Sequence, residues 1–141
     1  MKSRFLKKTM LFAGTMGASA FLISSTGSRL PDGTPWVAPA SADAVKNPLS
    51  GNAEATAAGK KTYTIYCVAC HGEKGKGDGL AAAGLNPKPA DHSNAKFQGQ
   101  TDGVIYWKLT TGRAPMAGYA KMLTDDQRWQ LVNYMRTLKK H

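Results

Sequence analysis

The sequence predicts an all-α domain, and three observations carry that prediction. The C-terminal end holds a long amphipathic pattern behind a strong helix start, and a stretch rich in Ala, Lys and Glu follows a good helix cap near the middle of the chain. No stretch alternates convincingly between polar and apolar residues as a strand does. We therefore expect about three to five helices, joined by long loops wherever glycines and prolines exclude regular structure.

The clearest helix lies at the C-terminal end. Thr124 and Gln127 have the spacing of a capping box, and two acidic residues between them suit the positive end of the helix dipole. An apolar stripe then follows helical spacing at Leu131, Tyr134, Met135 and Leu138. This stripe is predicted to pack in the core.

Two further helices are predicted upstream. One begins after Asn52, a favourable N-cap, and continues through His71. Gly59 within it costs about 1 kcal/mol relative to Ala, which favours the close approach of another element, with a tolerated surface glycine as the alternative. The other covers Thr101–Gly112, with Thr101 as its cap and Gly112 at its end.

The N-terminal residues 1–28 have the layout of an export signal, because a basic segment precedes an uncharged one of 20 residues. That length is also about the minimum for a membrane-spanning helix, so a cleaved signal peptide and an uncleaved N-terminal membrane anchor both stay open. Either way, we expect the remainder of the chain to leave the cytoplasm. Residues 29–50 read as an extended Pro-rich linker, and residues 51–141 as the compact domain.

The charge balance is basic, with a formal net charge of +10. Residues 43–141 hold 14 Lys and Arg against eight Asp and Glu, so 14 − 8 leaves +6 on the domain. This surface is either simply solvated or steers an acidic protein partner toward the domain. No basic helix or aromatic–basic stripe is present, which argues against nucleic acid as a partner.

The chemistry of the chain centres on its only two cysteines, Cys67 and Cys70, with His71 directly after them. A zinc site needs further ligands that the chain lacks, a redox dithiol belongs at a helix start after a strand, and a bare disulfide is the weakest alternative. Cys-x-x-Cys-His is the attachment signature of c-type haem. Residues three apart on a helical turn face the same way, so both thiols can bond one porphyrin while the histidine binds its iron. We therefore expect one covalently bound haem c.

The second axial ligand is expected to be a methionine. Met116 follows a proline in a loop between two predicted helices, and we predict it as the ligand opposite His71. Met122, close to a helix cap, and Met135, within the apolar stripe, are the weaker candidates and suit packing roles. His92 is expected to be a surface loop residue.

These stretches resemble class I c-type cytochromes, in their small single-haem form of the bacterial periplasm. "GKKTYTIYCVACHGEKGKGDG" is similar to the N-terminal helix, haem motif and glycine-rich loop of that family, and "GRAPMAGYAKMLTDDQRWQLVNYMRTL" to its methionine loop and C-terminal helix. The resemblance implies a cytochrome c-like all-α domain wrapped around a covalently attached haem. It also implies that Gly59 and Tyr63 meet Trp129 and Tyr134 where the first and last helices cross.

The resemblance further implies groups that surround the haem. The carbonyl of Pro87 or Pro89 would accept a hydrogen bond from His71, and the choice between them stays open. Trp107 and Arg113 are candidates for the haem propionates, with plain packing and plain solvation as the alternatives.

An iron with both axial positions filled has no open site for a substrate, so the sequence predicts an electron carrier and not an enzyme. We expect it on the periplasmic side of the bacterial inner membrane, anchored or soluble after signal cleavage, where it passes single electrons between respiratory-chain components. Its partners would be redox proteins with acidic docking surfaces, which meet lysines at positions 74, 76, 88 and 121. Two alternatives stay open: a tethered haem subunit of a larger membrane oxidoreductase complex, and a haem enzyme or sensor with an open sixth site.

Overall fold

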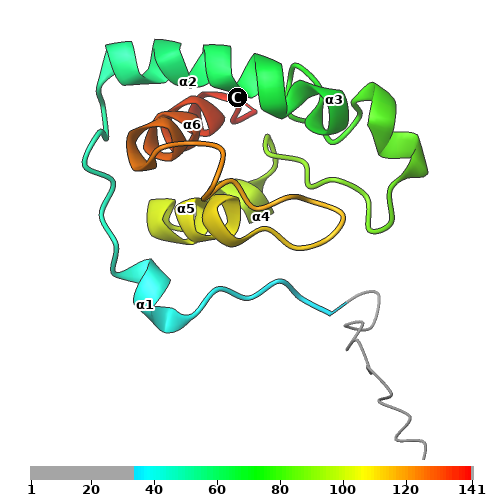
Figure 1. Ribbon diagram of the computed structural model, residues 1–141, viewed down its shortest axis with the longest axis horizontal. Coiled ribbons are helices and arrows are strands. Elements are labelled where there is room, and N and C mark those ends of the chain that lie inside the picture. The colour runs from blue at the N-terminus through cyan, green and yellow to red at the C-terminus, as the bar shows by residue number, and fades with distance from the viewer. Residues whose placement is uncertain (1–33, 141) are drawn as a thin grey trace, which may run out of the picture.

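The computed structural model describes residues 34–140, and the predicted signal or anchor of residues 1–28 lies outside them. Within the described range the chain is helical, without a named strand, which confirms the predicted all-α fold. None of the helices in this range is long and apolar enough to cross a membrane. In chain order the elements are α1 (Ala40–Asp43), α2 (Ala53–Tyr66), α3 (Val68–His71), the 3-10 helix η1 (Leu80–Gly84), α4 (Ala95–Gln98), α5 (Asp102–Thr111) and α6 (Asp125–Thr137) (Figure 1).

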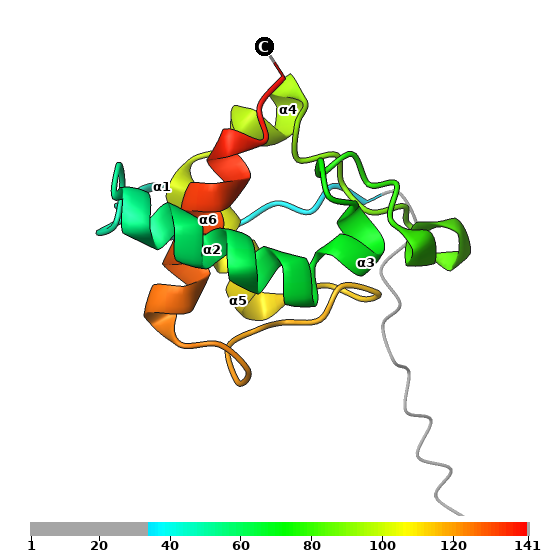
Figure 2. The same cartoon turned by 90° about the horizontal axis from the view of Figure 1, so that it is seen from above.

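The two longest helices, α2 and α6, cross each other (Figure 2). Gly59 lies at the crossing, where a Cβ atom would overlap the backbone carbonyl of Gln130. One turn further along α2, Tyr63 is 1% exposed and packs against Tyr134 of α6, with ring centroids 5.1 Å apart. The close approach predicted at Gly59 is therefore confirmed, and it explains why this helix tolerates a glycine.

The starts of these helices follow the sequence signals. Asn52 accepts a hydrogen bond from the Ala55 amide at 2.9 Å, and Thr124 and Gln127 form the reciprocal capping box. The end of α2 differs from the prediction, because the helix stops at Tyr66 and not at His71. At Cys67 the backbone φ of −116° departs from the usual helical value of about −63°, and the chain restarts as the single turn of α3.

The core lies between α2, α5 and α6. Trp129 of α6 stacks on Tyr106 of α5, with centroids 3.9 Å apart and planes inclined by 13°. This stacking joins α6 to α5. The buried apolar cluster comprises Tyr63, Cys67, Phe97, Ile105, Leu109, Leu123, Trp129, Leu131, Val132 and Met135.

The segment before α2 lies along α5, and we call its described residues 34–50 the N-terminal arm (Figure 1). The arm contains the single turn α1. Asn47 donates its side-chain amide to Asp102 at 2.9 Å and to Asn133 at 2.8 Å. These hydrogen bonds hold the arm against both α5 and α6.

Candidate haem site

The two cysteines lie around one helical turn. Cys67 is the N-cap of α3, Cys70 lies within it, and neither is in a disulfide. Cys67 is 4% exposed and Cys70 is half-buried. Burial first, and the neighbouring Cys70 second, raise the pKa of the Cys67 thiol to about 12, so this thiol is protonated at neutral pH. The arrangement presents two thiols from one short element.

His71 ends α3, and one of its ring nitrogens is already occupied. Its Nδ1 lies 3.0 Å from the carbonyl oxygen of Ala90. Burial lowers the pKa of His71, and the hydrogen bond to Ala90 opposes that shift only in part. The imidazole is therefore neutral, with Nδ1–H donating to the carbonyl and the Nε2 lone pair left for a metal.

The acceptor for His71 corrects the expectation drawn from the family, because it is neither Pro87 nor Pro89. The Pro89 carbonyl faces Gly77, where a Cβ atom would overlap it. The next carbonyl along the chain, that of Ala90, is the one that meets the imidazole. The acceptor is therefore one residue beyond Pro89 and three beyond Pro87.

His92 is also placed differently from the prediction, since it is buried and not on the surface. Its ring stacks on that of His71, with centroids 4.1 Å apart and planes inclined by 21°. Phe97 lies 4.4 Å away between ring centroids, and the Tyr63 hydroxyl is 3.3 Å from Nδ1. Burial, with His71 as the second cause, lowers the pKa of His92 to about 3, so this imidazole is neutral as well. One local signal was present: Asn94 caps α4 by accepting from the Phe97 amide, which places Phe97 near the residues before the cap.

The three candidate methionines have distinct environments. Met116 is half-buried against the core, and its loop is tied by two backbone hydrogen bonds to Arg113, of 3.0 and 2.9 Å. Met122 is 51% exposed, and Met135 is buried within the core stripe of α6. Met116 stays the predicted ligand, because it combines a tight loop with partial exposure.

The two residues expected near the haem propionates meet the N-terminal arm. Trp107 packs against Trp36, and the Arg113 guanidinium lies over the same Trp36 ring at 5.4 Å. Arg113 also donates to the Thr34 carbonyl at 2.9 Å. The sequence led us to expect Trp36 to be a local docking residue. Its partners lie far along the chain, and nothing in its local sequence identifies them.

The residues present fit a covalently attached haem. Two unpaired thiols lie around one helical turn, and a neutral histidine beside them has its Nδ1 bonded and its Nε2 free. No group of three or more His, Cys, Asp or Glu side chains that could hold a metal ion occurs among residues 34–140. Fold and site together define a c-type haem protein of the all-α class.

Comparison with known proteins supports this class. The family model for cytochrome c matches residues 56–139, and the chain belongs to the cytochrome c family. Its cofactor is therefore covalently bound haem c, as the sequence predicted. A comparison with curated proteins found no match.

The solved structures that are similar to this chain include a chain of an HAO-like protein complex and a c-type cytochrome. One is a chain of the "Kuenenia stuttgartiensis reducing HAO-like protein complex Kustc0457/Kustc0458", at 36% identity and a TM-score of 0.61 over 68% of this chain. This protein spans only 50% of that chain. The other is "KustC0563 c-type cytochrome", at 28% identity and a TM-score of 0.51, with 58% of this chain and 98% of that chain covered.

Proposed function

We propose that this protein is a single-haem electron carrier on the periplasmic side of the bacterial inner membrane, with His71 and Met116 as axial ligands of the iron. The observation that carries the proposal is the hydrogen bond from His71 Nδ1 to the Ala90 carbonyl. This bond places the proton on Nδ1, so the lone pair of Nε2 can bind the iron. The chain contains one Cys-x-x-Cys-His motif, which accounts for one haem. The likeness to c-type cytochromes supports electron transfer as the function.

Bound haem supplies a one-electron couple between Fe(II) and Fe(III). The chain's own residues tether, orient and shield it. Cys67 and Cys70 would hold the porphyrin through thioether bonds, and the bond to Ala90 restrains the Nδ1 edge of the neutral His71 ring. Tyr63 and the apolar cluster around it exclude water behind the motif.

A second candidate function rests on the likeness to the HAO-like complex. The matched chain belongs to a protein complex and is about twice as long as the region it shares with this protein. This favours a haem subunit of a larger oxidoreductase complex as the alternative to a free carrier. A haem enzyme or sensor with an open sixth site is the third candidate, and it requires Met116 to be absent from the iron.

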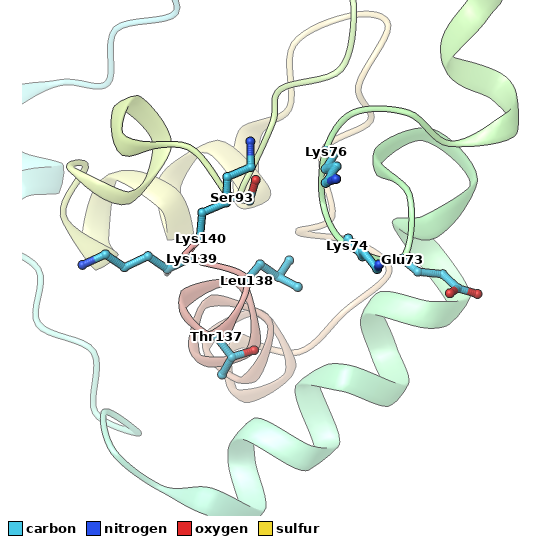
Figure 3. Close-up of a pocket in the computed structure, with 8 residues that line it drawn as sticks. All are labelled: Glu73, Lys74, Lys76, Ser93, Thr137, Leu138, Lys139 and Lys140. Atoms are coloured by element: carbon cyan, nitrogen blue, oxygen red, sulfur yellow. The ribbon is translucent and has the colours of Figure 1, made fainter.

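The basic surface suits an acidic redox partner. Lys74 and Lys76 line an open hollow of about 350 Å³ together with Lys139 and Lys140 (Figure 3). Lys88 does not line this hollow. Its ammonium donates to the Ala82 and Ala83 carbonyls at 3.1 and 2.8 Å. The expected rim of lysines is thus replaced, in this proposal, by a hollow that draws on both the haem-motif loop and the end of α6.

The spectrum of the haem-loaded protein tests the ligation. We expect a low-spin ferric spectrum with the weak far-red band that methionine ligation gives, and no rapid binding of CO by the reduced form. A high-spin spectrum or fast CO binding would favour the enzyme or sensor and overturn the carrier.

Cell fractionation tests the location and the tether. We expect the haem-loaded protein in the periplasmic fraction, or in membranes that keep it through a salt wash. Co-purification with a membrane oxidoreductase at constant stoichiometry would favour the subunit. Haem-loaded protein confined to the cytoplasm would contradict the proposal.

Retention on immobilised polyglutamate tests the lysine hollow. The double variant Lys74→Glu/Lys76→Glu should elute at clearly lower salt than wild type. Lys60→Glu/Lys61→Glu is the matched control, because both residues are exposed on α2 and make the same charge change. Equal elution of the two double variants would mean that only net charge matters, which contradicts a specific docking hollow.

A further inference from the structure

His92 is enclosed by residues from three different parts of the chain. His71 lies against one side of its ring, and Phe97 of α4 packs at 4.4 Å between ring centroids. Tyr63 of α2 approaches it edge-on, with its hydroxyl 3.3 Å from Nδ1. The residue is 4% exposed, so its ring has little freedom to move independently of these neighbours.

The backbone of His92 is held as firmly as its ring. Its amide donates to the Gly75 carbonyl at 2.6 Å, and its carbonyl accepts from the Gln98 side chain at 2.7 Å. The same Gln98 amide reaches the Met135 carbonyl at 2.9 Å. His92 is therefore fixed to the haem-motif loop, to α4 and to α6 at once.

This arrangement provides what the hydrogen bond to Ala90 lacks. A carbonyl oxygen accepts over a broad range of angles, so that bond limits rotation of the His71 ring about Cβ–Cγ without fixing the ring plane. A flat neighbour whose plane is inclined by only 21° opposes such a turn, because turning would drive the edge of one ring into the face of the other. An aliphatic side chain of similar size has no flat face with which to do this.

We propose that His92 is a positioning residue of the haem site, whose ring fixes the rotational setting of the His71 imidazole. The inference rests on the proposed role of His71 as iron ligand. The plane of an axial imidazole determines how its π orbital overlaps the iron orbitals, and this overlap sets the anisotropy of the ferric spectrum. His92 thereby acts on the electronic state of the iron through His71, without contact to the metal.

Electron paramagnetic resonance of the ferric holoprotein tests this, with His92→Leu and His92→Phe as the pair of variants. His92→Leu should shift the g values and broaden them, since the imidazole gains a range of settings. His92→Phe restores a flat ring and should return the g values toward wild type. Unchanged g values in His92→Leu, or the same shift in both variants, would overturn the proposal.

A measurement on the unmodified protein keeps the inference testable if His92→Leu does not fold. In the reduced, diamagnetic holoprotein, ring protons of His71 and His92 should show nuclear Overhauser contacts, and their absence would overturn the stack. The failure of the proposed function looks different: wild type would then lack the low-spin methionine-ligated spectrum. A wild-type spectrum of that kind, with g values insensitive to His92→Leu, contradicts this inference alone.

Discussion

Trp36 packs against Trp107, with ring centroids 6.4 Å apart and planes inclined by 58°. Two cations lie over the same indole, the Lys108 ammonium at 5.5 Å and the Arg113 guanidinium at 5.4 Å. An aromatic ring with cations at its face gains about 0.5–1 kcal/mol for each at exposed sites. Trp36 thus attaches the N-terminal arm to the C-terminal half of α5 and to the loop that follows it.

Trp36→Ala should release the start of the arm from the domain. Loss of the ring contact and both cation contacts removes roughly 1–2 kcal/mol of local stability, so transient opening increases about tenfold. Limited proteolysis followed by mass spectrometry should show faster cleavage between residues 34 and 50. Val37→Ala is the control, because Val37 is 76% exposed and should leave the cleavage rate unchanged. Equal rates for wild type and Trp36→Ala would show that the arm is held elsewhere.

Gly59→Ala should weaken the crossing of α2 and α6. The new methyl group would meet the Gln130 carbonyl, and overpacking of this kind costs about 1–3 kcal/mol. The better helix propensity of alanine returns up to about 1 kcal/mol, so chemical denaturation should still show a net loss. Gly84→Ala is the matched control, since nothing lies within 4 Å of a Cβ there. A Gly59→Ala protein as stable as wild type would mean that the helices separate at little cost.

Met116→Ala should abolish the weak far-red band of the ferric holoprotein, because the sulfur ligand is lost. Met122→Ala should keep the band, since Met122 is 51% exposed on the far part of the same loop. Absorption spectra of the two variants, at equal haem content, make the comparison. Loss of the band in Met122→Ala and its persistence in Met116→Ala would reverse the ligand assignment.

Ser93→Ala should alter the acid titration of Asp91. The Ser93 hydroxyl is the main cause of the lowered pKa of this carboxyl, with the Ser93 amide and Lys140 contributing further and partial burial opposing. A lowered folded-state pKa stabilises the protein above the ordinary value of 3.8, and this stabilisation is lost as the pH falls through the folded value. Without the hydroxyl, the pKa should rise toward 3.8 in an NMR titration of the side-chain carboxyl.

The same change should reach the stability profile of the protein. The difference in unfolding free energy between wild type and Ser93→Ala should shrink as the pH falls from 3.8 through the lowered pKa of Asp91 in the folded protein. Ser50→Ala, on an exposed residue, should leave both the titration and the profile unchanged. A carboxyl pKa unaffected by Ser93→Ala would assign the shift to the Ser93 amide and Lys140.

Local signals made much of the fold predictable. The capping box at Thr124 and the cap at Asn52 each set a helix start within a few residues of sequence, and the structure begins both helices there. Cys67, Cys70 and His71 indicated haem attachment because their spacing alone carries the chemistry, and the family confirms the haem. Gly59 indicated the helix crossing because glycine destabilises a helix interior relative to alanine, and close packing of a second helix offsets that cost.

The features that were missed depend on contacts between distant segments. His92 was expected on the surface, yet Tyr63, His71 and Phe97 enclose it, and they come from three separate elements. Its surroundings could not be read from the loop in which it lies. The acceptor at Ala90 was missed for another reason. The direction of a carbonyl depends on the backbone torsion angles, and prolines restrict the range of these angles without determining their values.

The bond from His71 to Ala90 also bears on how the site tolerates mutation. Its acceptor is a main-chain carbonyl, which every amino acid carries, so no side-chain replacement at position 90 can delete it. What can displace it is a change in chain length between the glycine-rich loop and α4, because one inserted or deleted residue would turn a different carbonyl toward the imidazole. The histidine's support is therefore robust to substitution and fragile to insertion or deletion, and related chains should vary in residue type here more freely than in length.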